Sequence, residues 1–332
     1  MSKKGGREAF ALGALAVLAL SMPAILAHNE YLISVLILIL LNILMTSSLR
    51  TIALLREISL GHVGFGLIGS YASALLMMKG GFSFWPALLT SGLLSAAIAL
   101  ALGYPFLRVK GIYFSILTLL TAETFRLAAF YWRGLTGGTM GLVGIPAPTP
   151  LAIPLLGSIS FDEVGAYYYL TLVVFAVCMA ALHLIERSHL GFAWRAIKNG
   201  EELSQSVGIN VIGYKVVNFA IASFFAGIAG SLFAHYQRSL SADFTSRFGV
   251  VTSIYLVVYM VVGGQRSFLG PAIGTLALTV ISEWARPMKE YQPMIIGAIA
   301  ILVVLFMPGG LAGLSSLAGR RVKGRPGIGG GG

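Results

Sequence analysis

Charged side chains are scarce in this chain. Only 35 of its 332 residues are charged, 23 Lys or Arg plus 12 Asp or Glu, whereas 57% are hydrophobic. Soluble domains carry about 25% charged residues, and a water-soluble fold of this length could not bury so much apolar surface. The mean hydropathy of +0.87 agrees. The composition excludes a soluble enzyme, a disordered chain and a fibrous protein, and it predicts a polytopic membrane protein.

Cysteine and the common catalytic motifs are also nearly absent. The single cysteine, Cys178, excludes a disulfide framework. The chain has no His-Glu-x-x-His motif and no phosphate-binding Gly-x-x-x-x-Gly-Lys-[Ser/Thr] loop, and its five histidines lack metal-ligand spacing. A membrane enzyme is therefore unsupported, and we expect no metal or cofactor in this chain. Carboxylates within the apolar stretches are few, which indicates that the energy for any transport comes from elsewhere.

Ten stretches are long and apolar enough to be membrane spans, which need about 20 mostly apolar residues. They are residues 9–27, 31–49, 59–78, 85–104, 111–130, 165–185, 215–235, 249–264, 268–284 and 291–307. The eighth and ninth are short, and they fit either a tight hairpin or a partly re-entrant pair. The sequence thus predicts an all-α integral membrane protein with one transmembrane domain over residues 1–332, a polytopic bundle of about ten helices.

The distribution of basic residues predicts the orientation. With the N-terminus inside and ten alternating spans, 16 of the 23 Lys and Arg residues fall in the inside segments. Because Lys and Arg collect on the cytoplasmic side, we expect both termini there, and the net charge of +11 indicates topology rather than nucleic-acid binding. A cleaved signal peptide is the alternative for the first span. The basic tail 318–332 is glycine-rich and expected to be flexible.

Small residues recur at helical spacing in two of the spans. Gly66, Ser70 and Ala74 form one row, beside Gly69 and Ser73; in span 215–235 the rows are Ser223-Gly227-Ser231 and Ala226-Gly230-Ala234. Such rows let helix backbones approach closely in lipid. They predict helix packing, and a moving pathway lined by these helices is the second interpretation. Elsewhere, Glu123 and Arg126 are spaced to pair on one helix face, and Asn42 is expected to bridge helices.

The inside segment 186–214 is too polar to span a membrane. Its spacing predicts two short helices separated at Gly200, the first carrying Trp194 and Ile197 and the second beginning at Glu201 and Glu202. Gly208 suits the left-handed position after the second helix. The narrow apolar edge of this loop fits either the groove of a partner protein or the lipid surface.

The outside loop 131–164 is rich in glycine near its start, with Gly134, Gly137, Gly138, Gly141 and Gly144 followed by Pro146. These residues predict a structured, non-helical, re-entrant segment rather than a loose loop. Its backbone N–H groups are candidates for contact with a solute carboxylate.

Four stretches, in order along the chain, resemble motifs of the permease subunits of branched-chain amino acid ABC importers. They are Ser59-Leu60-Gly61-His62 with Gly66 and Gly69-Ser70-Tyr71-Ala72; Thr136-Gly137-Gly138-Thr139-x-Gly141-Leu142-x-Gly144-Ile145-Pro146; Leu190-Gly191-x-Ala193-Trp194-x-Ala196-Ile197-Lys198 with Glu201-Glu202 and Ser206-Val207-Gly208; and Gly263-Gly264 and Gly270-Pro271 with Pro308-x-Gly310-Leu311. The resemblance covers about residues 30–312 and is closer to the larger of the two permease subunits. Three positions depart from the family pattern: Arg56-Glu57 replace a glycine-rich stretch, Arg195 an acidic residue and Arg266 a small one.

The resemblance implies a permease in the cytoplasmic (inner) membrane of a bacterium or archaeon. Its implied partners are a second permease subunit, two ABC ATPase subunits that bind the ATP and Mg, and a periplasmic solute-binding protein. The implied ATPase-coupling residues are Gly191, Ala193, Trp194, Ala196, Glu201, Glu202 and Gly208. The expected substrate-pathway residues are Gly66, Ser70, Thr136, Gly137, Gly138, Gly141 and Gly144. The expected solute is a branched-chain, apolar amino acid; urea, a short amide or a sugar remains open, as does an independent secondary carrier.

Overall fold

The computed structural model describes residues 21–23, 29–153, 157–243, 246–288, 290–307 and 309–313. Its long and medium helices are α2 (Glu30–Ala53), α3 (His62–Met78), α4 (Phe84–Phe106), α5 (Ile112–Tyr131), α7 (Val164–Arg187), α8 (His189–Asn199), α10 (Val211–Gln237), α11 (Val250–Gly263), α12 (Gly270–Trp284) and α13 (Gln292–Phe306). The short elements are α6 (Arg133–Thr136), α9 (Glu201–Ser206), the 3-10 turns η1 (Gly138–Met140), η2 (Arg286–Met288) and η3 (Leu311–Gly313), and the strands β1 (Leu142–Val143), β2 (Leu151–Ile153), β3 (Gly157–Ile159) and β4 (Ser239–Leu240).

Helices occupy nine of the ten ranges that were expected to span the membrane. The first range, 9–27, lies outside the described residues except for 21–23, and so does the tail 318–332. Within the described ranges, six stretches are long and apolar enough to cross a bilayer: α2, α4, α5, α7, α10 and the stretch Gln292–Gly313. Helices α3, α11 and α12 are shorter, with 17, 14 and 15 residues. The helical membrane class is thus supported, by length and composition.

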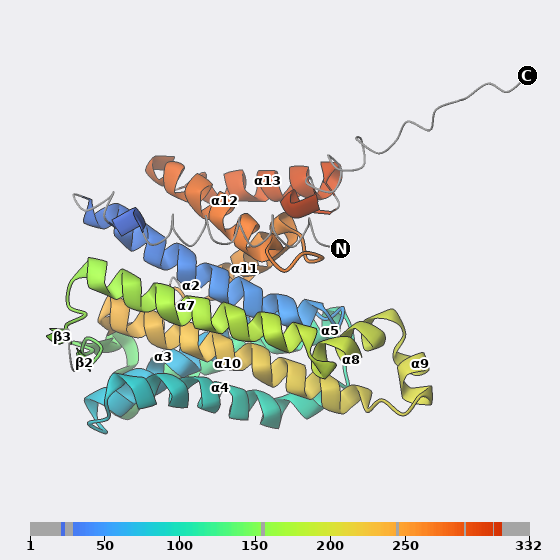
Figure 1. Cartoon of the computed structure of the whole chain (residues 1–332), viewed down its shortest axis with the longest axis horizontal. Coiled ribbons are helices and arrows are strands. Elements are labelled where there is room, and N and C mark those ends of the chain that lie inside the picture. The colour runs from blue at the N-terminus through green and yellow to red at the C-terminus, as the bar shows by residue number, and fades with distance from the viewer. Residues whose placement is uncertain are drawn as a thin grey trace, which may run out of the picture.

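Figure 1 shows how these helices are arranged. Helices α2, α7, α10 and α4 run along the long axis of the molecule, and α12 and α13 lie beyond α2. Helices α8 and α9 lie at one end, which we call the α8–α9 end, and β2 and β3 lie at the opposite end, which we call the β-strand end (Figure 1). There β2 pairs antiparallel with β3. β1 pairs antiparallel with β4, with Leu142 opposite Leu240, so the segment after α5 is joined to the end of α10.

Helix α3 begins at His62, three residues after the expected start at residue 59. The chain leaves the end of α2 through Arg56, whose φ is +62°. It then runs against α5 without forming a helix: the Leu60 N–H donates to Thr118 Oγ1 at 3.2 Å. A Cβ on Gly61 would lie 1.9 Å from the Thr118 carbonyl oxygen. The packing against α5 therefore requires the glycine and delays the first helical turn.

Helices α3, α4 and α10 approach one another through the small residues that the sequence places at helical spacing. A Cβ on Gly230 would lie 1.9 Å from the Gly66 carbonyl oxygen, and one on Gly69 would lie 2.3 Å from that of Gly227. A Cβ on Gly227 would lie 2.7 Å from the Ser91 carbonyl oxygen of α4. The predicted use of these rows in close helix packing is confirmed.

An aromatic cluster stabilises the same part of the bundle. Phe219 of α10 meets Phe65 of α3 edge to face, with ring centroids 5.2 Å apart. It also lies 6.0 Å from Phe114 of α5 and 6.4 Å from Phe106 of α4. Such pairs each contribute about 0.5–1.5 kcal/mol beyond area burial, so one side chain joins four helices.

Candidate functional site

The turn from α7 into α8 brings the predicted coupling loop back against the bundle. The Ser188 hydroxyl caps α8 by accepting from the Leu190 N–H at 3.3 Å. Gly191 packs on the end of α7 so tightly that a Cβ there would lie 1.9 Å from the Glu186 carbonyl oxygen. A side chain at position 191 would push α8 away from α7.

Helix α8 is held against the bundle by one buried edge. Trp194 and Ile197 are buried with Leu54, Leu55 and Val211, at the ends of α2 and α10. The Trp194 indole N–H donates to the Tyr214 carbonyl at 3.2 Å. The other two predicted coupling residues of α8 are less covered: Ala193 is half-buried and Ala196 is exposed.

Helix α9 follows directly and presents apolar side chains to solvent. It begins at Glu201 after Gly200, as expected, and Gly208 beyond its end has a φ of +87°. The predicted pair of short helices and the left-handed Gly208 are thereby confirmed. Leu203 is 72% exposed and Val207 is 71% exposed. Both lie at the α8–α9 end, beyond the long helices (Figure 1).

A cluster of two acids and two bases fixes α9 to the bundle. Glu201 accepts hydrogen bonds from Lys215 of α10 and, at 2.8 Å, from Lys110 in the turn before α5. Lys215 also lies 3.3 Å from Glu57, whose other oxygen accepts from the Gly111 N–H. Burial raises the pKa of the Glu201 carboxyl, but the two lysine hydrogen bonds lower it more, so the net shift is downward. Glu201 is therefore an internal anchor, whereas Glu202 is exposed.

A cavity of about 550 Å³ opens beside α9. The residues that line it come from the α2–α3 connection, the turn before α5, and α8 and α9: Leu55, Arg56, Glu57, Lys110, Gly111, Ile197, Lys198, Asn199, Gly200, Glu201, Glu202 and Leu203. Burial and the neighbouring cations Arg50, Arg56 and Arg266 lower the pKa of the Lys198 ammonium. The α8–α9 end thus has a concave surface that carries charges of both signs.

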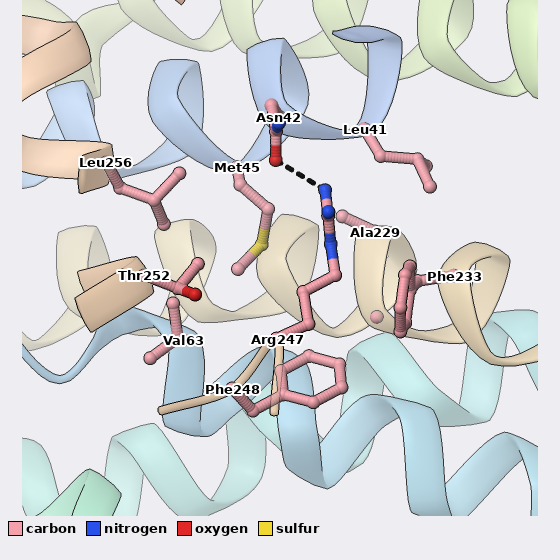
Figure 2. Close-up of a pocket in the computed structure, with 11 residues that line it drawn as sticks. Leu41, Asn42, Met45, Val63, Ala229, Phe233, Arg247, Phe248, Thr252 and Leu256 are labelled. Atoms are coloured by element: carbon pink, nitrogen blue, oxygen red, sulfur yellow. Dashed lines mark hydrogen bonds between the residues drawn. The ribbon is translucent and has the colours of Figure 1, made fainter. Parts of the chain in front are cut away.

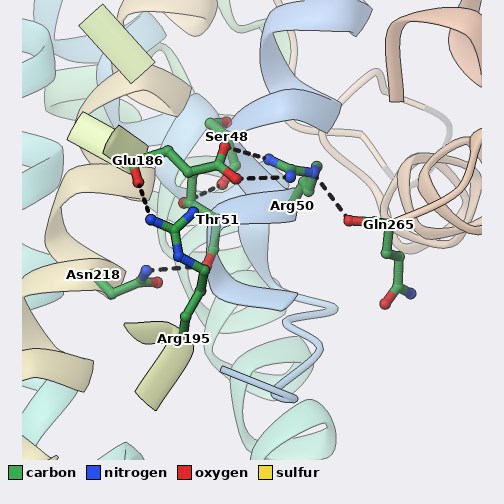
Figure 3. Close-up of polar contacts among 7 residues, drawn as sticks. All are labelled: Ser48, Arg50, Thr51, Glu186, Arg195, Asn218 and Gln265. Atoms are coloured by element: carbon green, nitrogen blue, oxygen red, sulfur yellow. Dashed lines mark hydrogen bonds and ion pairs between the residues drawn. The ribbon is translucent and has the colours of Figure 1, made fainter. Parts of the chain in front are cut away.

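Arg50 connects this end to the interior of the bundle, as Figure 3 shows. Its guanidinium donates to both Glu186 oxygens at 2.8 and 3.0 Å, and its Nε donates to the Gln265 carbonyl at 3.1 Å. Arg195 of α8 donates to the Glu186 carbonyl at 3.2 Å. One chain of polar contacts therefore runs from α8 through the end of α7 to α2 and the α11–α12 turn.

The predicted pathway residues after α5 form an ordered segment at the β-strand end. The Thr136 hydroxyl donates to the Ala129 carbonyl, and Gly137, Gly138, Gly141 and Gly144 all have φ between +60° and +78°. The segment was expected to be non-helical, and this expectation was wrong in part, because α6 and η1 each form a short helical turn in it. Four of its backbone N–H groups, those of Gly138, Gly141, Gly144 and Ile145, donate within the chain. These four are already satisfied.

The neighbouring polar pair also agrees with expectation. Arg126 and Glu123 form an ion pair on α5, and Arg126 donates to the Ala242 carbonyl at 2.6 Å. The predicted pairing at i, i+3 is confirmed, and Arg126 in addition joins α5 to the segment after β4.

The two other pathway residues, Gly66 and Ser70, lie on α3. Ser70 is buried and donates to the Leu67 carbonyl. Gly66 borders a small internal cavity: a Cβ there would lie 3.0 Å from Met45 Cε and 3.4 Å from Phe248, which both line it. Figure 2 shows this cavity, with Asn42 and Arg247 joined by a hydrogen bond. Asn42 was expected to bridge helices, and it instead joins α2 to the segment before α11. The position of Arg247 in the interior was not foreseen.

The structure therefore separates the predicted residues into two regions. The coupling residues gather on α8 and α9, and the glycine-rich segment lies at the β-strand end (Figure 1). Gly66 and Ser70 lie between them on α3.

Comparison with known proteins identifies the family. Residues 31–306 match the family described as branched-chain amino acid transport system permease component. The chain is 32% identical to the high-affinity branched-chain amino acid transport system permease protein LivM of Salmonella typhimurium over 76% of this chain and 63% of that protein. It is 30% identical to LivM of Escherichia coli K12 over 90% of this chain and 74% of that protein.

The permease protein LivH of Salmonella typhimurium is 28% identical over 43% of this chain and 46% of that protein. No solved structure matches the chain. The family match covers most of the chain, and LivM of Escherichia coli agrees over nine-tenths of it. The chain therefore belongs to the family of branched-chain amino acid transport system permease components.

Proposed function

We propose that this chain is a permease subunit of an ATP-driven importer that carries branched-chain amino acids across the cytoplasmic membrane. Its proposed partners are a second permease subunit, two ATPase subunits that bind ATP and Mg, and a periplasmic binding protein. The family match and the names of the LivM and LivH relatives support the solute class and the second permease. The chain itself has no phosphate-binding loop, so hydrolysis belongs to the ATPase subunits.

The observation that carries the proposal is an exposed apolar pair, Leu203 on α9 and Val207 directly after it. Leu203 and Val207 project from a segment that Glu201 fastens to Lys110 and Lys215. Exposed apolar side chains on a firmly held helix suit the groove of a partner protein. A lipid surface is the weaker match, because α9 also carries Glu202 and polar neighbours.

The polar contacts of Arg50 connect this docking surface to the helices of the bundle. A displacement of α8 moves Arg195 and the end of α7, and with it the Glu186 carboxylate that holds Arg50. Arg50 in turn holds the α11–α12 turn through the Gln265 carbonyl. We propose that this series of contacts carries the movement of the ATPases into the bundle.

The test is the replacement of Leu203 and Val207 together by serine in the complete transporter. We expect the ATPases to co-purify about tenfold less, because truncating a few central apolar side chains typically removes 1–2 kcal/mol or more of binding. Uptake of labelled leucine should fall in parallel.

The matched control is Met140→Ser, which removes an apolar side chain that is 86% exposed at the β-strand end. It should leave ATPase recovery unchanged. If the double serine variant retains both ATPase recovery and uptake, α9 is not the coupling element and the proposal loses its main support.

A further inference from the structure

An arginine lies inside the bundle with no ion-pair partner among the residues that the structure describes. Arg247 belongs to the segment between β4 and α11, and its side chain reaches α2 (Figure 2). Its Nη2 donates to Asn42 Oδ1 at 2.5 Å, and its guanidinium carbon lies 4.8 Å from the centre of the Phe233 ring. Asn42 is the middle of α2, which runs from Glu30 to Ala53, so the guanidinium lies deep between the two ends.

Arg247 differs from two other interior arginines in the way its charge is compensated. Arg50 pairs with Glu186, and Arg126 pairs with Glu123. Among the described residues no carboxylate forms an ion pair with Arg247. A partly buried charge with only neutral partners is costly, and ionisable groups within membrane bundles mark solute pathways. The guanidinium therefore has capacity for an anion that this chain does not supply.

The surroundings of Arg247 match an amino acid with an apolar side chain. The cavity beside it is lined by one cation, one amide and mainly apolar groups, among them Leu41, Met45 and Leu256. Its lining residues come from this chain's own α2, α3, α10 and α11 and from the segment before α11. The volume is about 20 Å³, which is room for a single water molecule. In this structure the cavity is therefore too small for an amino acid.

The start of α11 adds a second feature that attracts anions. The helix begins at Val250, three residues after Arg247, and no side chain caps its first N–H groups. The N-terminal end of a helix carries a partial positive charge, and interrupted helices in transporters direct such ends at anionic solute groups. The positive end of the α11 dipole and the guanidinium of Arg247 therefore lie close together, and both would attract an anion.

We propose that Arg247 binds the carboxylate of the transported amino acid inside the bundle, in a state in which this cavity is wider. The planar guanidinium can donate two parallel hydrogen bonds to a carboxylate. Asn42 holds the guanidinium between transport cycles, and the apolar walls receive the side chain of the solute. This inference rests on the proposed function and adds a residue that recognises the solute.

A carboxylate could reach Arg247 from one other source, an acidic side chain of the second permease subunit. The position of the cavity between four helices of this chain favours the solute. The two sources differ in their consequences, because a partner's side chain would hold the subunits together and the solute would not.

The experiment uses the complete transporter, reconstituted in vesicles with its binding protein. We expect Arg247→Gln to lower the uptake of labelled leucine by about 10- to 100-fold, the effect of losing hydrogen bonds to a charged group. Recovery of the second permease on the tagged chain should be unchanged. Arg247→Lys should retain an intermediate rate, because it keeps the charge but not the paired donors.

Two further variants make the test specific. Asn42→Asp places a fixed carboxylate against Arg247 with almost no change in shape, and it should also abolish most uptake by competing with the solute. Arg238→Gln is the matched control: Arg238 is half-exposed at the β-strand end and pairs with Asp162. It should transport within about twofold of the unaltered protein, the range expected for an exposed ion pair.

Each contrary result has a defined meaning. Normal leucine uptake by Arg247→Gln or by Asn42→Asp overturns the inference and leaves the proposed function intact. If the second permease is lost from the Arg247→Gln complex, the carboxylate that binds Arg247 belongs to that subunit, and the inference is likewise overturned. If the unaltered complex carries no branched-chain amino acid, the proposed function itself fails, and this inference with it.

Discussion

Arg56 occupies a backbone conformation that an arginine rarely adopts. Its φ of +62° is in the left-handed region, and its side chain is exposed in the connection between α2 and α3. The left-handed conformation costs an ordinary residue about 1–2 kcal/mol. A glycine would take this turn without strain.

The corresponding prediction is that Arg56→Gly stabilises the protein. The relief of strain exceeds the entropy that glycine adds to the unfolded chain, and the net gain should be about 0.5–1 kcal/mol. Thermal unfolding of the purified protein in detergent measures it. Arg187→Gly is the control, since Arg187 is the exposed last residue of α7 and its φ is not positive, so glycine there relieves no strain and should not raise stability. A lower unfolding midpoint for Arg56→Gly would contradict the strain argument.

Sequence reasoning at this scale succeeds where the constraint is local. The left-handed Gly208 follows from the helix end before it, and the Glu123–Arg126 pair follows from spacing on one helix. The depth of Arg247 could not be predicted in the same way. Its place depends on where α11 begins inside the bundle, which is decided by tertiary packing.

At the scale of elements, the contact between α3 and α10 depends on missing side chains. We predict that Gly230→Ala destabilises the protein by about 1–3 kcal/mol, the usual cost of overpacking, because the new Cβ would lie 1.9 Å from the Gly66 carbonyl oxygen. Gly297→Ala on α13 is the control, since nothing lies within 4 Å of its added Cβ. It should leave stability unchanged or raise it slightly through helix propensity. Equal unfolding midpoints for the two variants would show that α3 and α10 can separate without loss.

The helices themselves follow from apolar runs and small-residue rows, and their approximate ranges were predictable. The details of their ends were not. The late start of α3 results from the contact of Leu60 and Gly61 with Thr118, which is 57 residues further on from Gly61. Likewise, the spacing of segment 186–214 predicts α8 and α9, but it contains no sign that Glu201 pairs with Lys110 and Lys215.

At the scale of the whole molecule, the proposal sets the α8–α9 end in the cytoplasm. The 16-to-7 division of basic residues supports this orientation. With Cys178 replaced by serine, a cysteine at Met140 should react with an impermeant reagent added outside intact cells. A cysteine at Leu203 should react only after the membrane is opened. Both positions are strongly exposed, so access alone decides the result, and the reverse pattern would invert the topology.

The glycine contacts between α3, α4 and α10 also restrict how the molecule can move. Carbonyl oxygens of one helix occupy the notches left by absent side chains on its neighbour, so a slide of α10 along α3 would drive backbone atoms into each other. Closely packed interfaces of this kind change between discrete arrangements instead of deforming gradually. We expect α3, α4 and α10 to travel as one rigid block, so that opening and closing take place along its borders with α2 and α11.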